Sequence, residues 1–248
     1  MFTPEERDRV RERVFELARA DGRVSGAALT GSAAIDAVDR WSDVDTSFGI
    51  ADGADPEAVL ADWTAQLERD PGVAHYWDLR VAPTIYRVLL MPGGLELNIA
   101  VTPADQFGAQ GPKFRLLFGE SVERPPPAPP DLEEMFGYGW LYVLVVRTAV
   151  ERGRLWQATH FLNALREQTL ALACVRFDEP HAYARGVHLL PPELVAPYEE
   201  TLVGTLDPSE LRRALRAATE LFLGEVEVAN PELAGRLRAP LSEAAGLA

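Results

Sequence analysis

The sequence predicts an α+β protein, in which an N-terminal mixed β-sheet with helices is followed by an all-α helical bundle. Three observations predict this fold class. Short β-rich segments accompany two helical segments in the first half, no strand pattern occurs in the second half, and a proline-rich stretch separates them. We therefore expect a sheet domain over residues 1–124, a linker over 125–130 and a helical domain over 131–248.

Both helices expected in the first half begin with a proline that follows a capping residue. Thr3 and Glu6 form a capping box around Pro4 in the first helix, and Asp55 precedes Pro56 in the second. A glycine follows each helical pattern and is expected to end it. The expected helices cover residues 3–22 and 55–72.

Apolar residues dominate the segments between and after these two helices, which predicts strands. The sequence Pro-Gly-Gly at residues 92–94 indicates a hairpin turn. Residues 33–40 are expected to form a brief helix or a loop. The expected strands cover residues 23–30, 43–50, 73–82, 84–91 and 94–102.

The linker has five prolines in the six positions 125–130, so it cannot continue a helix or a central strand. Beyond it the apolar pattern is helical, and three of the segments open with a proline near a cap position. We expect a bundle of about five helices. They cover residues 131–152, 154–176, 191–204, 207–229 and 230–245.

Composition limits the classes of function. The 248 residues are 47% hydrophobic and 25% charged, which is ordinary for a soluble globular protein. No apolar run approaches the roughly 20 residues that cross a bilayer, and the charged N-terminus does not read as a secretory signal, so we expect no membrane partner and a cytoplasmic location. The single cysteine excludes an internal disulfide framework.

The formal net charge is −14, from 38 acidic and 24 basic residues. This balance argues against a nucleic-acid partner, because a long nucleic-acid footprint needs clustered Lys and Arg. It suits a cationic small molecule, although an acidic surface also serves solubility alone.

One pattern in the first half points to chemistry. Asp43 and Asp45 lie on the same side of an expected strand, because side chains alternate along a strand with period 2. Two carboxylates so close repel each other unless a divalent cation bridges them, and Mg²⁺ is often held by one or two carboxylates together with substrate phosphates. The preceding Gly31-Ser32 turn can present backbone N–H groups and a hydroxyl to a phosphate.

An acid-x-acid pair alone is not specific, since Glu6/Asp8 and Glu225/Glu227 show it on expected helices. The combination is more specific: Gly-Ser after an apolar strand, then two acids at the start of another strand. As "TGSAAIDAVDRWSDVDTSF" it resembles the nucleotidyltransferase superfamily of the polymerase-β type, in the aminoglycoside-nucleotidyltransferase branch. The segments "DRWSDVD", "FRLLFG" and "RGRLWQA" are similar to those of actinobacterial members, and the resemblance covers most of the chain.

The resemblance implies Mg²⁺-dependent transfer of a nucleoside monophosphate from an NTP, with ATP expected, to a hydroxyl of a small, aminoglycoside-like acceptor. Asp43 and Asp45 would hold Mg²⁺, and Gly31 and Ser32 would hold the β/γ phosphates. Independently of the resemblance, Arg166 lies in an apolar stretch in the middle of an expected helix, where it would reach the triphosphate or hold a catalytic acid. The alternative is an ion pair that extends out of the bundle.

The family has a third acid on a later strand, and the position that aligns with it here is Asn98. Glu96 lies two residues earlier and so on the same face. Three readings stay open. Glu96 supplies the missing charge as a catalytic residue, Asn98 gives a weaker site as a neutral oxygen ligand near the nucleotide, or catalysis is lost and the protein only binds a nucleotide or ligand. A less favoured option is a toxin or antitoxin that modifies a protein.

Overall fold

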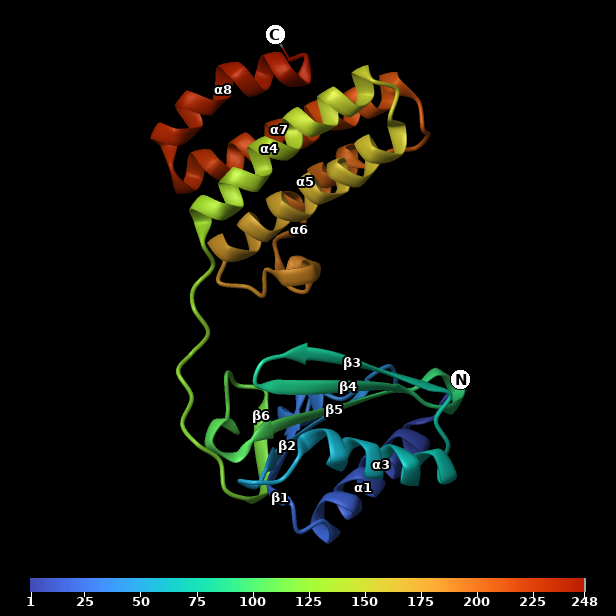
Figure 1. Cartoon of the computed structure of the whole chain (residues 1–248). Helices are drawn as coiled ribbons and strands as arrows, with labels where there is room; N and C mark the ends of the chain where they lie inside the picture. Colours follow the sequence, from blue (N-terminus) through green and yellow to red (C-terminus); the bar gives the residue numbers. More distant parts are fainter. Residues whose placement is uncertain (248) are drawn as a thin grey trace. The chain divides into compact units, whose positions relative to one another are not determined.

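The computed structural model describes residues 1–247 and divides into two compact units, residues 1–128 and 129–248 (Figure 1). The predicted α+β class is confirmed, because a six-stranded mixed sheet with helices precedes a helical region. Each unit has its own hydrophobic core. The boundary between them falls in the proline-rich segment, which has no regular secondary structure.

The sheet unit begins with a helix whose capping box forms as the sequence predicts, since the Thr3 side chain and the Glu6 side chain bond each other's backbone N–H. The element bounds in this unit are α1 (Pro4–Ala20), β1 (Val24–Thr30), α2 (Gly31–Ala34), β2 (Val44–Ile50), α3 (Pro56–Arg69), β3 (His75–Val81), β4 (Thr84–Leu90), β5 (Glu96–Pro103) and β6 (Phe114–Gly119).

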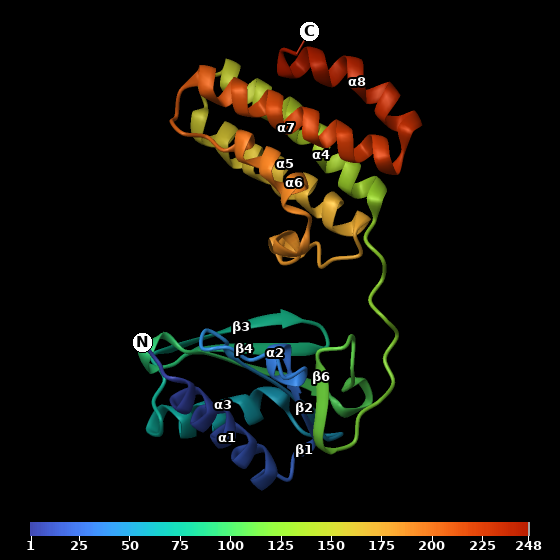
Figure 2. The same cartoon turned by 180° about the vertical axis from the view of Figure 1, so that it is seen from behind.

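The strand order is β3-β4-β5-β2-β1-β6. Strands β2 and β5 pair in parallel, and the other neighbouring strands pair antiparallel. Helices α1 and α3 cover the same face of the sheet in both views (Figures 1 and 2). The core lies between these two helices and the sheet, and β2 contributes Val44, Phe48 and Ile50 to it. Alternation along β2 therefore turns Asp45 to the face without these helices.

An ion pair is buried under the helices of this unit. Arg87 of β4 donates through Nε and Nη2 to the two carboxylate oxygens of Asp78, both at 2.7 Å, and through Nη1 to Thr64 of α3 at 2.9 Å. These charge-assisted bonds lower the pKa of the Asp78 carboxyl. The guanidinium thus joins the edge of the sheet to the helix that covers it.

The helical unit contains α4 (Leu132–Glu151), α5 (Leu155–Arg176), α6 (Pro192–Val195), α7 (Pro208–Ala229) and α8 (Pro231–Ala245). Asp131, Asp207 and Asn230 cap α4, α7 and α8 through their side chains. Helix α7 packs against α4 and α5, and α8 packs against α7 and α4. No helix of the described chain is both long enough and apolar enough to cross a bilayer.

Two features of the helical core matter for its stability. A Cβ on Gly139 of α4 would lie 2.1 Å from Cε2 of Phe222 on α7, so the two helices approach closely there. Arg176 donates to the buried Glu225 carboxylate at 3.1 Å. This single contact does not offset the loss of water, and burial raises the pKa of Glu225.

Two expectations differ from the structure. Residues 114–119 form the edge strand β6, which the sequence pattern did not predict; the strand has exposed apolar residues and no clear alternation. Residues 191–204 were expected to be one helix, but they form the four-residue α6 followed by a 3₁₀ helix over Ala196–Thr201. Pro197 explains the change, because it has no N–H to continue the α-helical bonds.

Candidate functional site

The residues of the acidic motif meet at one end of the central strands β1, β2 and β5. Strand β1 ends where β2 begins because the two are antiparallel, and β5 begins beside the start of β2 because those two are parallel. Asp43 directly precedes β2 and Asp45 is its second residue. In the parallel register Asp45 is aligned with Asn98 of β5, and Glu96 is the first residue of that strand.

The amide of Asn98 connects two of the acids. Its Nδ2 donates to Asp45 Oδ1 at 3.1 Å and to Glu96 Oε1 at 3.0 Å. Both contacts place the positive end of an N–H dipole against a carboxylate, which reduces the repulsion between the two charges. The buried Thr46 hydroxyl donates to the Asn98 backbone oxygen at 2.8 Å and fixes this part of β5 against β2. Asn98 is therefore a bridge between the acids.

Gly31 lies against the other oxygen of Asp45. Its φ is +62°, and a Cβ built on it would be 1.9 Å from Asp45 Oδ2. No side chain fits in that space, so only glycine permits this approach of the backbone to the carboxylate. Ser32 follows in α2, half-buried, and its backbone oxygen accepts from the N–H groups of Ile35 and Ala37. The Gly-Ser pair and Asp45 are thus neighbours in space.

The loop that leads to the acids is closed by Asp39. Its Oδ1 accepts from the Trp41 N–H at 2.8 Å and from the Ser42 hydroxyl at 3.0 Å. These hydrogen bonds lower the pKa of the Asp39 carboxyl. Arg7 of α1 donates to the Asp39 backbone oxygen. Hydrogen bonds within the loop and one from α1 therefore fix the conformation of the loop before Asp43.

Arg115 supports α2, a role that the sequence did not predict. Arg115 of β6 donates through Nη2 to the Ala33 backbone oxygen at 2.6 Å and through Nη1 to the Asp36 carboxylate at 2.9 Å. No local pattern signals this role, because the partners are 79 and 82 positions away in the sequence. The Asp-x-x-Ser spacing of residues 39–42, in contrast, is a recognisable turn signal.

The donor set fits Mg²⁺ bound together with phosphates. Asp43 and Asp45 are half-buried, and Glu96 is exposed at the same end of the central strands. Within residues 1–247 no three His, Cys, Asp or Glu side chains form a complete metal cluster. Mg²⁺ does not require one, since it usually keeps one or two carboxylates and completes its shell with water and phosphate oxygens.

Arg166 lies in the helical unit, on α5. It donates through Nε and Nη2 to the hydroxyl and backbone oxygen of Thr201, at 2.6 and 2.8 Å, and through Nη1 to Asn163 at 3.0 Å. Burial lowers its pKa. These bonds hold the 3₁₀ helix on α5, and its assignment to nucleotide binding stays a prediction. The structure brings together Gly31, Asp45, Glu96 and Asn98, with Ser32 and Asp43 next to them in the chain.

Comparison with known proteins gives likenesses among solved structures only. No protein-family model matches the chain, and no curated protein matches it. Among solved structures, an aminoglycoside 6-adenyltransferase from Bacillus subtilis aligns with a TM-score of 0.42 and 12% identity, over 94% of this chain and 92% of that one. Evidence for function therefore comes from the residues at the end of the central strands.

Proposed function

We propose that this protein is a metal-dependent nucleotidyltransferase that moves a nucleoside monophosphate from an NTP, ATP first, to a hydroxyl of a small cationic acceptor. The observation that carries the proposal is the cluster of residues at the end of the central strands. In it Gly31 lies against one oxygen of Asp45, and Asn98 joins the other oxygen to Glu96. A cationic acceptor suits the net charge of −14.

In this proposal Asp43 and Asp45 would hold Mg²⁺, which when bound would neutralise charge on the triphosphate. Gly31 and Ser32 contact the β and γ phosphates through the backbone and the hydroxyl. The acceptor oxygen forms a bond to the α phosphorus, the bond from that phosphorus to the bridging oxygen breaks, and pyrophosphate leaves. Glu96 takes the proton from the acceptor hydroxyl, a step typically worth roughly 10²- to 10⁴-fold in rate.

Asn98 supports a second candidate function, a nucleotide-binding protein with weak or no catalysis. Its amide donates to both acids, a role that an unprotonated aspartate in the same position cannot fill. The carboxylates are therefore partly neutralised before any metal binds, which lowers their affinity for the cation. Under this alternative nucleotide binding persists and turnover does not.

Calorimetric titration of ATP and GTP into the full chain, with and without Mg²⁺, tests the proposal. We expect Mg²⁺-dependent binding that disappears in the variant Asp43→Asn/Asp45→Asn. The matched control is the variant Asp52→Asn/Asp105→Asn, which removes two acids just beyond the opposite ends of β2 and β5. It should bind as the wild type does. Absence of wild-type binding, or equal loss in the control, contradicts the nucleotide site.

Pyrophosphate release with amino-sugar acceptors separates the two candidate functions. For a transferase with Glu96 as the base, Glu96→Gln lowers turnover by about 10²-fold or more and leaves ATP binding unchanged. If the wild type binds ATP but releases no pyrophosphate with any acceptor, the binding function is favoured. If Asn98→Asp then creates turnover, the position of the third acid explains the loss.

A further inference from the structure

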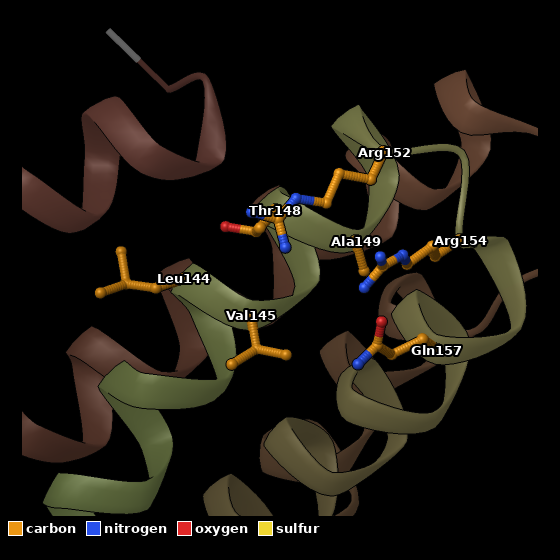
Figure 3. A pocket seen from close by; sticks show the side chains of 7 residues that line it. All are labelled: Leu144, Val145, Thr148, Ala149, Arg152, Arg154 and Gln157. Atoms are coloured by element: carbon orange, nitrogen blue, oxygen red, sulfur yellow. The ribbon is translucent and has the colours of Figure 1, made fainter.

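The helical unit has a separate pocket at the turn between α4 and α5, with a volume of about 250 Å³ (Figure 3). Its apolar wall comes from Leu144, Val145 and Ala149 on α4. Ala149 is buried in the core of the bundle, so this wall is a fixed part of the fold. None of these residues belongs to the sheet unit, and the pocket is distinct from the acidic site.

Four polar side chains complete the lining. All four line the pocket, and in Figure 3 the Arg152 side chain extends toward Thr148 while the Arg154 guanidinium extends toward Ala149 and Gln157. Among residues 1–247 these four side chains have no hydrogen-bond or ion-pair partner. All of their polar groups can therefore bind a ligand.

The charge at this turn is uncompensated by the nearest acid in the chain. Glu151 pairs with Arg212 of α7 at 2.9 Å. Arg152 and Arg154 therefore bring two guanidinium groups to the lining of one pocket. An anion with several oxygens suits such a lining, because guanidinium groups bind phosphate through paired N–H···O bonds.

We propose that this pocket binds the phosphate group of a small phosphorylated molecule. Arg152 and Arg154 contact the phosphate, Thr148 and Gln157 donate to its remaining oxygens, and the carbon part of the ligand packs on Leu144 and Val145. A polyanion such as nucleic acid is disfavoured, because the chain carries a net charge of −14 and repels an extended negative surface. The proposal does not depend on the nucleotidyltransferase function.

Calorimetry on the full chain in EDTA, with phenyl phosphate and inorganic phosphate as probes, tests the pocket. We expect phenyl phosphate to bind more tightly than inorganic phosphate because of the apolar wall. The variant Arg152→Gln/Arg154→Gln should weaken binding by at least about tenfold. Both arginines are exposed, so the melting temperature should not change.

The matched control is Arg185→Gln/Arg236→Gln, which removes two exposed charges elsewhere on the helical unit. It should bind phenyl phosphate as the wild type does. The proposal is overturned if the wild type does not bind either probe, if the Arg152/Arg154 variant keeps its affinity, or if the control loses as much. The single variants Arg152→Gln and Arg154→Gln give the same comparison if the double variant fails to fold.

Discussion

Each unit contains a glycine pressed against a side chain, and the two contacts differ in kind. In the sheet unit a Cβ on Gly31 would lie 1.9 Å from a carboxylate oxygen of Asp45, and in the helical unit a Cβ on Gly139 would lie 2.1 Å from the Phe222 ring. Close packing explains the second contact fully. The first brings backbone toward a carboxylate at the end of the central strands, and it belongs to the group of residues on which the proposed nucleotide site depends.

Each unit also has an arginine–carboxylate pair with one buried partner, and these two pairs differ as well. Asp78 accepts two bonds of 2.7 Å from Arg87, and its pKa is lowered, whereas Glu225 accepts one bond of 3.1 Å from Arg176, and its pKa is raised. A bidentate partner thus outweighs the loss of water for one carboxylate, and a single contact does not for the other.

The largest effect is expected for Gly31→Ala. Its positive φ and its contact with Asp45 should together destabilise the fold by about 3 kcal/mol and abolish Mg²⁺-dependent ATP binding. Gly53→Ala is the control, because Gly53 also has a positive φ, of +79°, but no atom within 4 Å of the added Cβ. Urea unfolding should give a loss of only about 1 kcal/mol there. Equal losses in both variants would remove the special role of the Asp45 contact.

Breaking the bidentate pair with Asp78→Asn should destabilise the protein by about 2 kcal/mol, because Arg87 keeps its charge in a buried position. The corresponding Glu225→Gln variant in the helical unit should be neutral or slightly stabilising. Hydrogen exchange measured by mass spectrometry assigns each change to its own unit. A larger loss for Glu225→Gln than for Asp78→Asn would reverse the comparison of the two pairs.

A smaller effect is expected at the helix–helix contact. Gly139→Ala forces a methyl group against Phe222, and overpacking minus the gain in helix propensity leaves a loss of about 1 kcal/mol. Gly137→Ala, two residues earlier in α4 with no atom within 4 Å, should instead stabilise the helix by up to about 1 kcal/mol. Thermal unfolding of both variants measures the difference. ATP binding should stay unchanged in each, unlike in Gly31→Ala.

The smallest effects concern pH. The lowered pKa of Asp78 adds stability that is present above its unfolded pKa, near 3.9, and is lost as the pH falls through the folded value. The raised pKa of Glu225 has the opposite sign: stability decreases as the pH rises from its unfolded value, near 4.3, through the folded one. The free energy of unfolding of Glu225→Gln, compared with the wild type from pH 4 to 8, should show an advantage that grows with pH.

The acidic site was predictable to the extent that it is local in the sequence. The spacing places Gly31 directly after β1 and Asp43 and Asp45 at the start of β2, and the period of 2 places Glu96 and Asn98 on one face of β5. The bridge from Asn98 to Asp45 depends on the parallel register of strands 53 positions apart, which no local pattern fixes.

The elements that the sequence did not predict have different causes. Strand β6 forms because β1 offers it an edge, and Arg115 on that strand supports α2 across 82 positions. This pairing is a tertiary contact, and intrinsic propensity is too weak to anticipate it. The α6 region departs from a single helix at Pro197, which is a local effect, and its 3₁₀ helix is then held by Arg166 through Thr201.

The order of the units along the chain has a consequence for synthesis on the ribosome. Every strand of the sheet lies before residue 120, and each pairs only with another strand of the same unit. The proline-rich segment then delays the first helix of the bundle until after residue 131. Because chains emerge from the ribosome N-terminus first, the sheet can complete its pairing before the helical unit has emerged, so the strand ends that carry the acids form without competition from the helices.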